Sequence, residues 1–164
     1  MNNFVTLKGI VDENFQDYKK ASMFLAFPRC DFKCFRELNL PISMCQNFSS
    51  IKSENIKVRI EDIFERYIKN AISESIVLGG LEPFLSFDEM FNLIKYFREQ
   101  KCDDDFVIYT GYNLNEIKDE IDKIKKFKNI VVKLGRFIPN SKKKFDKILG
   151  VTLASENQYA ILLG

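Results

Sequence analysis

Three of the four cysteines lie close together in the segment CDFKCFRELNLPISMC, which runs from Cys30 to Cys45. Three residues separate Cys30 from Cys34, and ten separate Cys34 from Cys45. Cysteine thiolates are the ligands of iron–sulfur clusters and, together with histidine, of zinc. Because the chain contains no histidine, any metal site here must depend on sulfur. We therefore expect metal or redox chemistry in this segment.

The spacing of the thiols leaves three alternatives open. Zinc takes four ligands, usually in two close pairs, and Cys30 with Cys34 offers one pair. A cubane iron–sulfur cluster is normally held by four thiolates, so three would leave one iron open to a small molecule. The third alternative is free thiols. Cys102, in EQKCDDD, has acidic neighbours that oppose thiolate formation, so we interpret it as structural or incidental.

Two glycine-containing segments could bind a small molecule. In GGLEP, Gly79 and Gly80 follow an apolar run, and glycine lets a backbone approach a ligand closely and offer amide donors. In YTGY (109–112), Gly111 follows another apolar run. Taken singly, each segment is also what an ordinary turn requires. Their position relative to the cysteines is what favours a shared site.

The elements that must position these residues alternate along the chain. Continuous apolar runs predict buried strands at 21–27, 75–80, 105–111, 129–135 and 159–163. Amphipathic stripes predict helices over 61–72, after Ser86 and after Asn113. Glu89 and Glu116 stand three residues beyond the last two starts, so both should carry a capping box.

Strands that alternate with helices of about a dozen residues are typical of βαβ units and a mostly parallel sheet. With 164 residues, the chain is too short for an eight-unit barrel of about 250 residues. We predict a single α/β domain over residues 1–164, folded as a partial, open (βα) barrel of about four to six units. The cysteine segment, GGLEP and YTGY each follow a strand, so they should meet at one rim.

Composition excludes several function classes. The net charge of +2 gives no electrostatic case for nucleic acid or an anionic membrane. The run Lys142-Lys143-Lys144 is typical of a solvated loop. No stretch approaches the roughly twenty apolar residues of a membrane span, and the first residues lack the apolar core of a signal peptide. We therefore expect a cytoplasmic protein.

Taken in order, the cysteine segment, GGLEP and YTGY resemble the radical S-adenosylmethionine enzymes. More narrowly, the chain is similar to the activating proteins of anaerobic ribonucleoside-triphosphate reductase, because GRFIP (135–139) and LGVTLASENQ (149–158) look like their closing signature. The resemblance spans residue 4 to the end of the chain.

The cysteine segment departs from that family in one respect. The family pattern places its third cysteine where this chain has Glu37, whereas Cys45-Gln46-Asn47 resembles the Cys-His-Asn that usually ends the motif. We interpret the segment as the family loop enlarged by the eight residues Glu37 to Met44. Ligation by the Glu37 carboxylate is the alternative.

The resemblance implies a [4Fe-4S] cluster held by Cys30, Cys34 and Cys45, whose fourth iron chelates the amino and carboxylate groups of S-adenosylmethionine. It also implies a set of residues around that cofactor. The backbone at Gly79, Gly80 and Leu81 would meet the amino group, Phe35 the adenine, and Thr110 and Gly111 the rest of the pocket. Glu82 would be a polar anchor or would instead fix the turn.

The activity that the resemblance implies is an activase reaction. One electron would cleave S-adenosylmethionine to methionine and a 5′-deoxyadenosyl radical, which would take hydrogen from a glycine of the partner. That partner would be a glycyl-radical enzyme, namely the anaerobic reductase, and a reductant such as flavodoxin would supply the electron. Two alternatives stay open: a radical enzyme acting on another peptide or a small molecule, and a non-catalytic iron–sulfur or zinc module.

Overall fold

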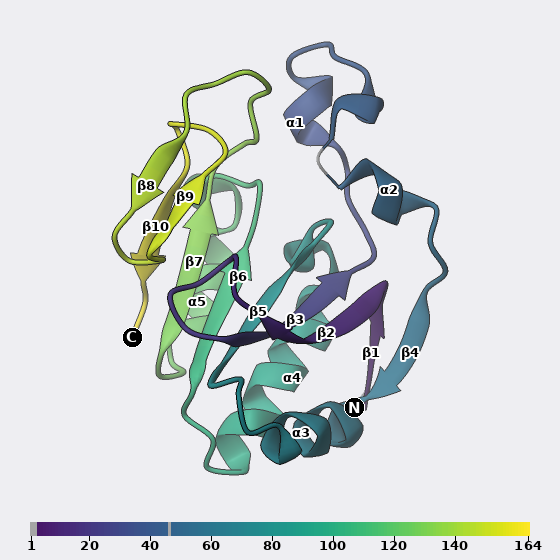
Figure 1. Cartoon of the computed structure of the whole chain (residues 1–164), viewed down its shortest axis with the longest axis vertical. Coiled ribbons are helices and arrows are strands. Elements are labelled where there is room, and N and C mark those ends of the chain that lie inside the picture. The colour runs from purple at the N-terminus through teal and green to yellow at the C-terminus, as the bar shows by residue number, and fades with distance from the viewer. Residues whose placement is uncertain (1–2, 46) are drawn as a thin grey trace.

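The computed structural model of the chain describes residues 3–45 and 47–164. Within this part, six strands form one sheet in the order β10-β7-β6-β5-β3-β2 (Figure 1). These strands are β2 (Gly9–Asn14), β3 (Ser22–Phe27), β5 (Ser75–Gly80), β6 (Asp105–Tyr109), β7 (Ile130–Leu134) and β10 (Tyr159–Leu162). The four central strands, β3, β5, β6 and β7, run parallel. The apolar runs therefore located five of these six strands, and the edge strand β2 was not predicted.

The prediction of a partial (βα) barrel is wrong. The sheet is mixed, because β2 runs antiparallel to β3 at one edge and β10 runs antiparallel to β7 at the other. Antiparallel neighbours need only a short connection, whereas parallel ones need a crossover, usually a helix. The alternation of strands and helices indicates only the parallel strands of the sheet. It could not predict that the two edge strands pair antiparallel.

Two small antiparallel pairs stand beside the main sheet. The strand β1 (Phe4–Leu7) pairs with β4 (Ile56–Arg59). This pair connects the first described residues to the segment that follows the cysteine loop, which comprises the cysteine segment and the residues up to 51. The strand β8 (Lys144–Asp146) pairs with β9 (Val151–Leu153), immediately before the chain returns as β10. Figure 1 shows the two pairs on opposite sides of the molecule.

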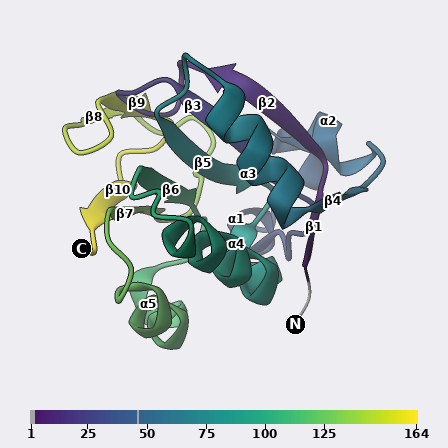
Figure 2. The same ribbon diagram turned by 90° about the horizontal axis from the view of Figure 1, so that it is seen from below.

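Three helices cover one face of the sheet: α3 (Ile60–Lys69), α4 (Phe87–Glu99) and α5 (Lys118–Ile124) (Figure 2). Their apolar stripes pack on alternate residues of the parallel strands, including Leu25 and Leu78. The other face carries a smaller cluster around Val77 and Val107, covered by Tyr18 and by residues of the β8–β9 region. Two side chains packed against this second cluster, Phe24 and Tyr109, also line the cavity described below.

The two expected capping boxes have different outcomes. Asn113 and Glu116 form one, with the Asn113 amide donating to the Glu116 carboxylate at 2.8 Å, at the start of the 3₁₀ turn η3 (Leu114–Glu116). The prediction of a capping box at Ser86 is wrong. Its hydroxyl makes no capping bond, and the Glu89 carboxylate instead accepts from the Thr6 amide at 3.0 Å. A tertiary contact with β1 has replaced the local one.

Short elements complete the described chain. The cysteine loop contains α1 (Lys33–Arg36), the 3₁₀ turn η1 (Ile42–Met44) and α2 (Phe48–Ile51), and a further turn, η2 (Pro83–Ser86), leads into α4. Of the helices in this part of the chain, none has both the length and the apolar character needed to cross a bilayer.

Candidate iron–sulfur site

A cavity of about 320 Å³ opens at the carboxyl ends of the parallel strands. It is lined by residues from the cysteine loop and from the loops after β5, β6 and β7. The residues that the resemblance implies for the site all lie on its wall: Cys30, Cys34, Phe35, Cys45, Gly79, Gly80, Leu81, Glu82, Thr110 and Gly111. The alternative ligand Glu37 is not among the described residues of the wall. The volume is at the low end of the range for small-molecule sites, about 300–1,000 Å³.

The three clustered thiols each receive a backbone hydrogen bond. The amide of Phe32 donates to the Cys30 sulfur at 3.3 Å, and that of Asn47 donates to the Cys45 sulfur at 3.4 Å. The Cys34 sulfur accepts from the amide of Phe137, which is 103 residues away, at 3.4 Å. All three are free, half-buried thiols. Amide donors around sulfur are the environment in which proteins hold and tune iron–sulfur clusters.

Cys102 lies elsewhere. It follows α4, where its amide donates to the Phe97 carbonyl at 3.0 Å and its side chain packs on the main core. It is absent from the described residues that line the cavity. Its interpretation as a residue outside the site agrees with this position.

Among residues 3–45 and 47–164, no three Cys, His, Asp or Glu side chains are close enough to share one ion. A single zinc would draw its thiolates to about 2.3 Å from one centre. In a cubane each thiolate binds a different iron, so the sulfurs stand further apart around a larger space. Burial raises the pKa of Cys30 to about 11 and also raises that of Cys34.

Two glycines allow the backbone to come close at this rim. Gly80 has φ +86°, and a Cβ there would lie 2.7 Å from the Phe27 nitrogen, so no side chain fits. A Cβ on Gly111 would lie 3.2 Å from the Cys34 sulfur. The missing side chains let the β5 loop turn over β3 and let the β6 loop reach the cysteine.

Glu82 joins the β5 and β6 loops. Its buried carboxylate accepts from the Phe84 amide at 3.0 Å, the Gly111 amide at 2.9 Å and the Thr110 hydroxyl at 2.8 Å. Burial raises the pKa of Glu82 to about 7, while these donors and Lys133 favour its ionised form. The contacts support its role in fixing the turn. A direct role toward a cofactor stays a prediction, as it does for Phe35.

Sequence reasoning missed Lys133. This side chain on β7 is 7% exposed and lines the cavity. Its ammonium lies over the Tyr109 ring, 5.5 Å from the centroid. Burial lowers the pKa of Lys133 to about 8, while Glu82 and Cys34 favour its charged form. A signal was available, because a lysine interrupts the otherwise apolar run NIVVKLG.

The second missed residue is Arg136, which follows β7. Its side chain is 11% exposed and donates to the Gly111 carbonyl and to the carboxylates of Glu37 and Glu116. Glu37 accepts at 2.6 Å, so it is engaged in an ion pair. A further pair closes the same rim, since the Tyr112 hydroxyl donates to Asp31 at 2.5 Å. None of these pairs is local in sequence, so spacing gave no hint of them.

Comparison with protein families adds the decisive observation. The family described as a 4Fe-4S single cluster domain matches residues 20–160, most of the chain. The chain belongs to this family. Comparison with curated proteins found no match. Membership of this family supports a [4Fe-4S] cluster over the zinc alternative, and the three thiols around the cavity are suited to hold it.

Gln46, part of the phrase that resembled the end of the family motif, lies outside the described residues. Its neighbours are described. Cys45 lines the cavity, and the Asn47 side chain donates to the Gly80 carbonyl at 2.8 Å. The end of the enlarged loop is thereby fastened to the turn formed by Gly79, Gly80, Leu81 and Glu82, the GGLE turn.

Proposed function

We propose that this chain is a radical S-adenosylmethionine enzyme whose cluster is held by Cys30, Cys34 and Cys45. The observation that carries the proposal is their convergence with two glycine-bearing loops on one cavity at the carboxyl ends of the strands. Among the described lining residues these are the three thiols. A [4Fe-4S] cluster with three protein ligands keeps one iron open to a small molecule.

The cavity offers groups suited to the methionyl part of S-adenosylmethionine. Gly79, Gly80 and Leu81 line the cavity, and their backbone would meet the amino group. Lys133 provides a buried cation for a carboxylate, and Phe35 and Phe24 provide aromatic surface. A cluster held by Cys30, Cys34 and Cys45, reduced by an external one-electron donor, would supply the electron for cleavage of the sulfonium S–C bond of S-adenosylmethionine to methionine and a 5′-deoxyadenosyl radical.

We propose further that the chain is an activase that acts on a glycine of a partner glycyl-radical enzyme, the anaerobic ribonucleotide reductase, with a one-electron reductant such as flavodoxin. The support is the resemblance at GRFIP and LGVTLASENQ. In the fold these two segments contact one another, since the Ile138 amide donates to the Ser155 hydroxyl at 2.7 Å and the Asn157 side chain donates to the Arg136 carbonyl at 3.0 Å. Together they wall the cavity beside Cys34.

The test is anaerobic reconstitution followed by reduction with S-adenosylmethionine present. We expect 5′-deoxyadenosine to form and to be detected by chromatography. Cys45→Ala should abolish both cluster and product, and the matched control Cys102→Ala should retain both. A fully loaded wild-type chain that makes no 5′-deoxyadenosine would contradict a radical enzyme and favour an electron-transfer module.

The partner requires a separate measurement. Incubation with an anaerobic reductase from the same source should produce a glycyl radical signal in electron paramagnetic resonance. Formation of 5′-deoxyadenosine without that signal would retain the radical enzyme but direct the search to another peptide or small-molecule substrate.

A further inference from the structure

Glu37, the first residue of the enlarged part of the cysteine loop, forms an ion pair with Arg136. It follows α1, where its own amide donates to the Lys33 carbonyl at 3.1 Å. Its carboxylate accepts two hydrogen bonds from one edge of the Arg136 guanidinium, at 2.6 Å from Nε and 3.4 Å from Nη2. The ion pair lowers the pKa of Glu37. The Glu37 carboxylate thus faces the arginine, and Glu37 is not among the described residues that line the cavity.

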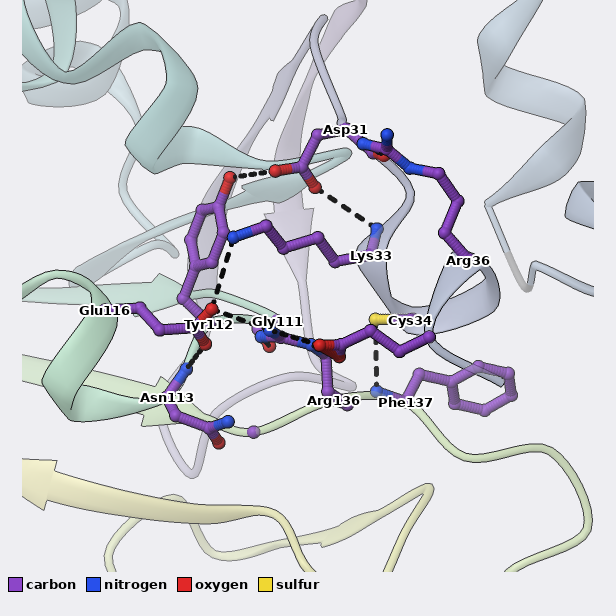
Figure 3. Close-up of polar contacts among 12 residues, drawn as sticks. Asp31, Lys33, Cys34, Arg36, Gly111, Tyr112, Asn113, Glu116, Arg136 and Phe137 are labelled. Atoms are coloured by element: carbon purple, nitrogen blue, oxygen red, sulfur yellow. Dashed lines mark hydrogen bonds and ion pairs between the residues drawn. The ribbon is translucent and has the colours of Figure 1, made fainter. Parts of the chain in front are cut away.

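Arg136 connects this loop to the rest of the rim. Its Nη1 donates to the Gly111 carbonyl at 2.6 Å, and its Nη2 donates to Glu116 at 2.7 Å (Figure 3). Glu116 in turn accepts from Lys33 at 3.3 Å. The guanidinium thus joins the cysteine loop to the β6 loop, and an arginine fork in this geometry is more specific than a point charge.

The same stretch of backbone positions a sulfur. The residue after Arg136 is Phe137, whose amide donates to Cys34 at 3.4 Å, and Figure 3 shows this bond next to the Arg136 side chain. Gly111, whose carbonyl accepts from Arg136, is the residue whose missing side chain leaves space for the Cys34 sulfur. Movement of Arg136 would therefore disturb Cys34 from two sides.

We propose that Glu37 and Arg136 are positioning residues for the cluster. Their ion pair fastens the enlarged loop to the β6 and β7 loops, so that Cys34 and Cys45 stay directed at one cavity. Glu37 occupies the place of a family cysteine without acting as a ligand. The inference rests on the assignment of Cys30, Cys34 and Cys45 as ligands, and it is independent of the radical reaction.

The experiment measures how fast iron leaves the anaerobically loaded chain when a strong chelator is added. Glu37→Gln and Arg136→Gln should each accelerate iron loss about tenfold, the lower end of what outer-shell changes cost a metal site. The double variant should be no faster than Arg136→Gln alone, because Glu37 acts through the arginine. The urea midpoint of the metal-free Glu37→Gln chain should stay at the wild-type value, since that carboxylate is exposed.

A matched ion pair provides the control. Arg66 and Asp12 are also 2.6 Å apart, but they lie outside the described cavity wall. Asp12→Asn should leave the rate of iron loss unchanged. An unchanged rate in Glu37→Gln would overturn the proposal. Additive effects in the double variant would also overturn it, because Glu37 would then act independently of Arg136. A lower iron content of Glu37→Gln at full loading would overturn it too, because that result would indicate a ligand.

The ligand assignment is checked separately with Cys45→Ala. If that variant loads iron as the wild type does, the assignment fails irrespective of what Glu37 does. If Cys45→Ala is empty and Glu37→Gln behaves as the wild type, only the positioning inference fails.

Discussion

The GGLE turn and the cysteine loop lie at the same rim and are built differently. The GGLE turn follows the buried strand β5, and Glu82 is 4% exposed with three protein donors on its carboxylate. The cysteine loop is largely exposed, and residues 38–51 contain no charged side chain. It is fastened by separate contacts at Glu37 and Asn47. One half of the site is therefore part of the core, and the other is attached to it.

This contrast has a consequence for energetics. Changes in the GGLE turn should reduce the free energy of unfolding of the whole chain, because buried groups lose their partners. Changes in the cysteine loop should leave the fold intact and affect cluster retention, because the loop contributes little to the core.

The largest effect is expected for Gly80→Ala. The backbone there has φ +86°, and the new Cβ would lie 2.7 Å from the Phe27 nitrogen. Such a conformation alone costs a non-glycine residue about 1–3 kcal/mol, and the clash adds to it, so we expect a loss above about 3 kcal/mol. Urea unfolding of the metal-free chain measures it. Gly9→Ala is the control, because a Cβ there meets nothing within 4 Å.

Glu82→Gln should be next. At acidic pH, where the Glu82 carboxyl is protonated, the amide nitrogen of glutamine replaces an oxygen that accepts a hydrogen bond and turns its hydrogens toward donors in a buried site. We therefore expect a loss of about 1–3 kcal/mol. The folded pKa of about 7 exceeds the usual 4.5. The stability from the protonated form is thus present below about pH 4.5 and lost as the pH rises through 7. The variant should lack this slope in a pH series of urea midpoints.

Glu116 on the same rim should show the opposite slope. Arg136 lowers its pKa to about 2, so its stabilising effect is present above the usual 4.5 and is lost as the pH falls toward 2. Glu116→Gln should remove the acid-side slope and leave the slope between 4.5 and 7. Two carboxylates that titrated in the same sense would contradict the described contacts.

Lys133→Met separates stability from ligand binding. Burial of the Lys133 ammonium is costly and lowers its pKa, so replacing it with an apolar side chain of similar length should not lower the urea midpoint. Affinity for S-adenosylmethionine, measured anaerobically by calorimetry, should drop at least about tenfold, because a charge-assisted hydrogen bond is lost. Unchanged affinity would show that the ammonium does not face the ligand.

The smallest effect on the fold is expected for Asn47→Ala. It removes one half-buried hydrogen bond to the Gly80 carbonyl, worth about 0.5–1.5 kcal/mol. We expect faster hydrogen exchange confined to residues 37–51 with little change elsewhere. Ser49→Ala, at an exposed neighbouring position in α2, is the control. Exchange that increased in β5 as well would mean that the loop is part of the core.

Local patterns accounted for the four parallel strands, for β10, for the three helices that cover the sheet and for the residue types of the site, but not for β1, β2, β4, β8 and β9. Apolar runs place β5 and β7, because a strand buried on both faces needs no polar alternation. The thiols and glycines were recognisable because few other side chains can do their chemistry. Ser86 shows the limit of such patterns, since Glu89, its expected partner, binds Thr6 on a distant strand.

By itself, the sequence determined the four parallel strands and β10, that three thiols and two glycine turns would follow strands, and that any metal chemistry would depend on sulfur. The tertiary structure decided the rest. Edge strands pair antiparallel, and Arg136 finds Glu37 across 99 residues. Lys133 is buried toward the cavity. These outcomes depend on which surfaces meet in three dimensions, and contacts between distant residues leave no periodicity in the chain.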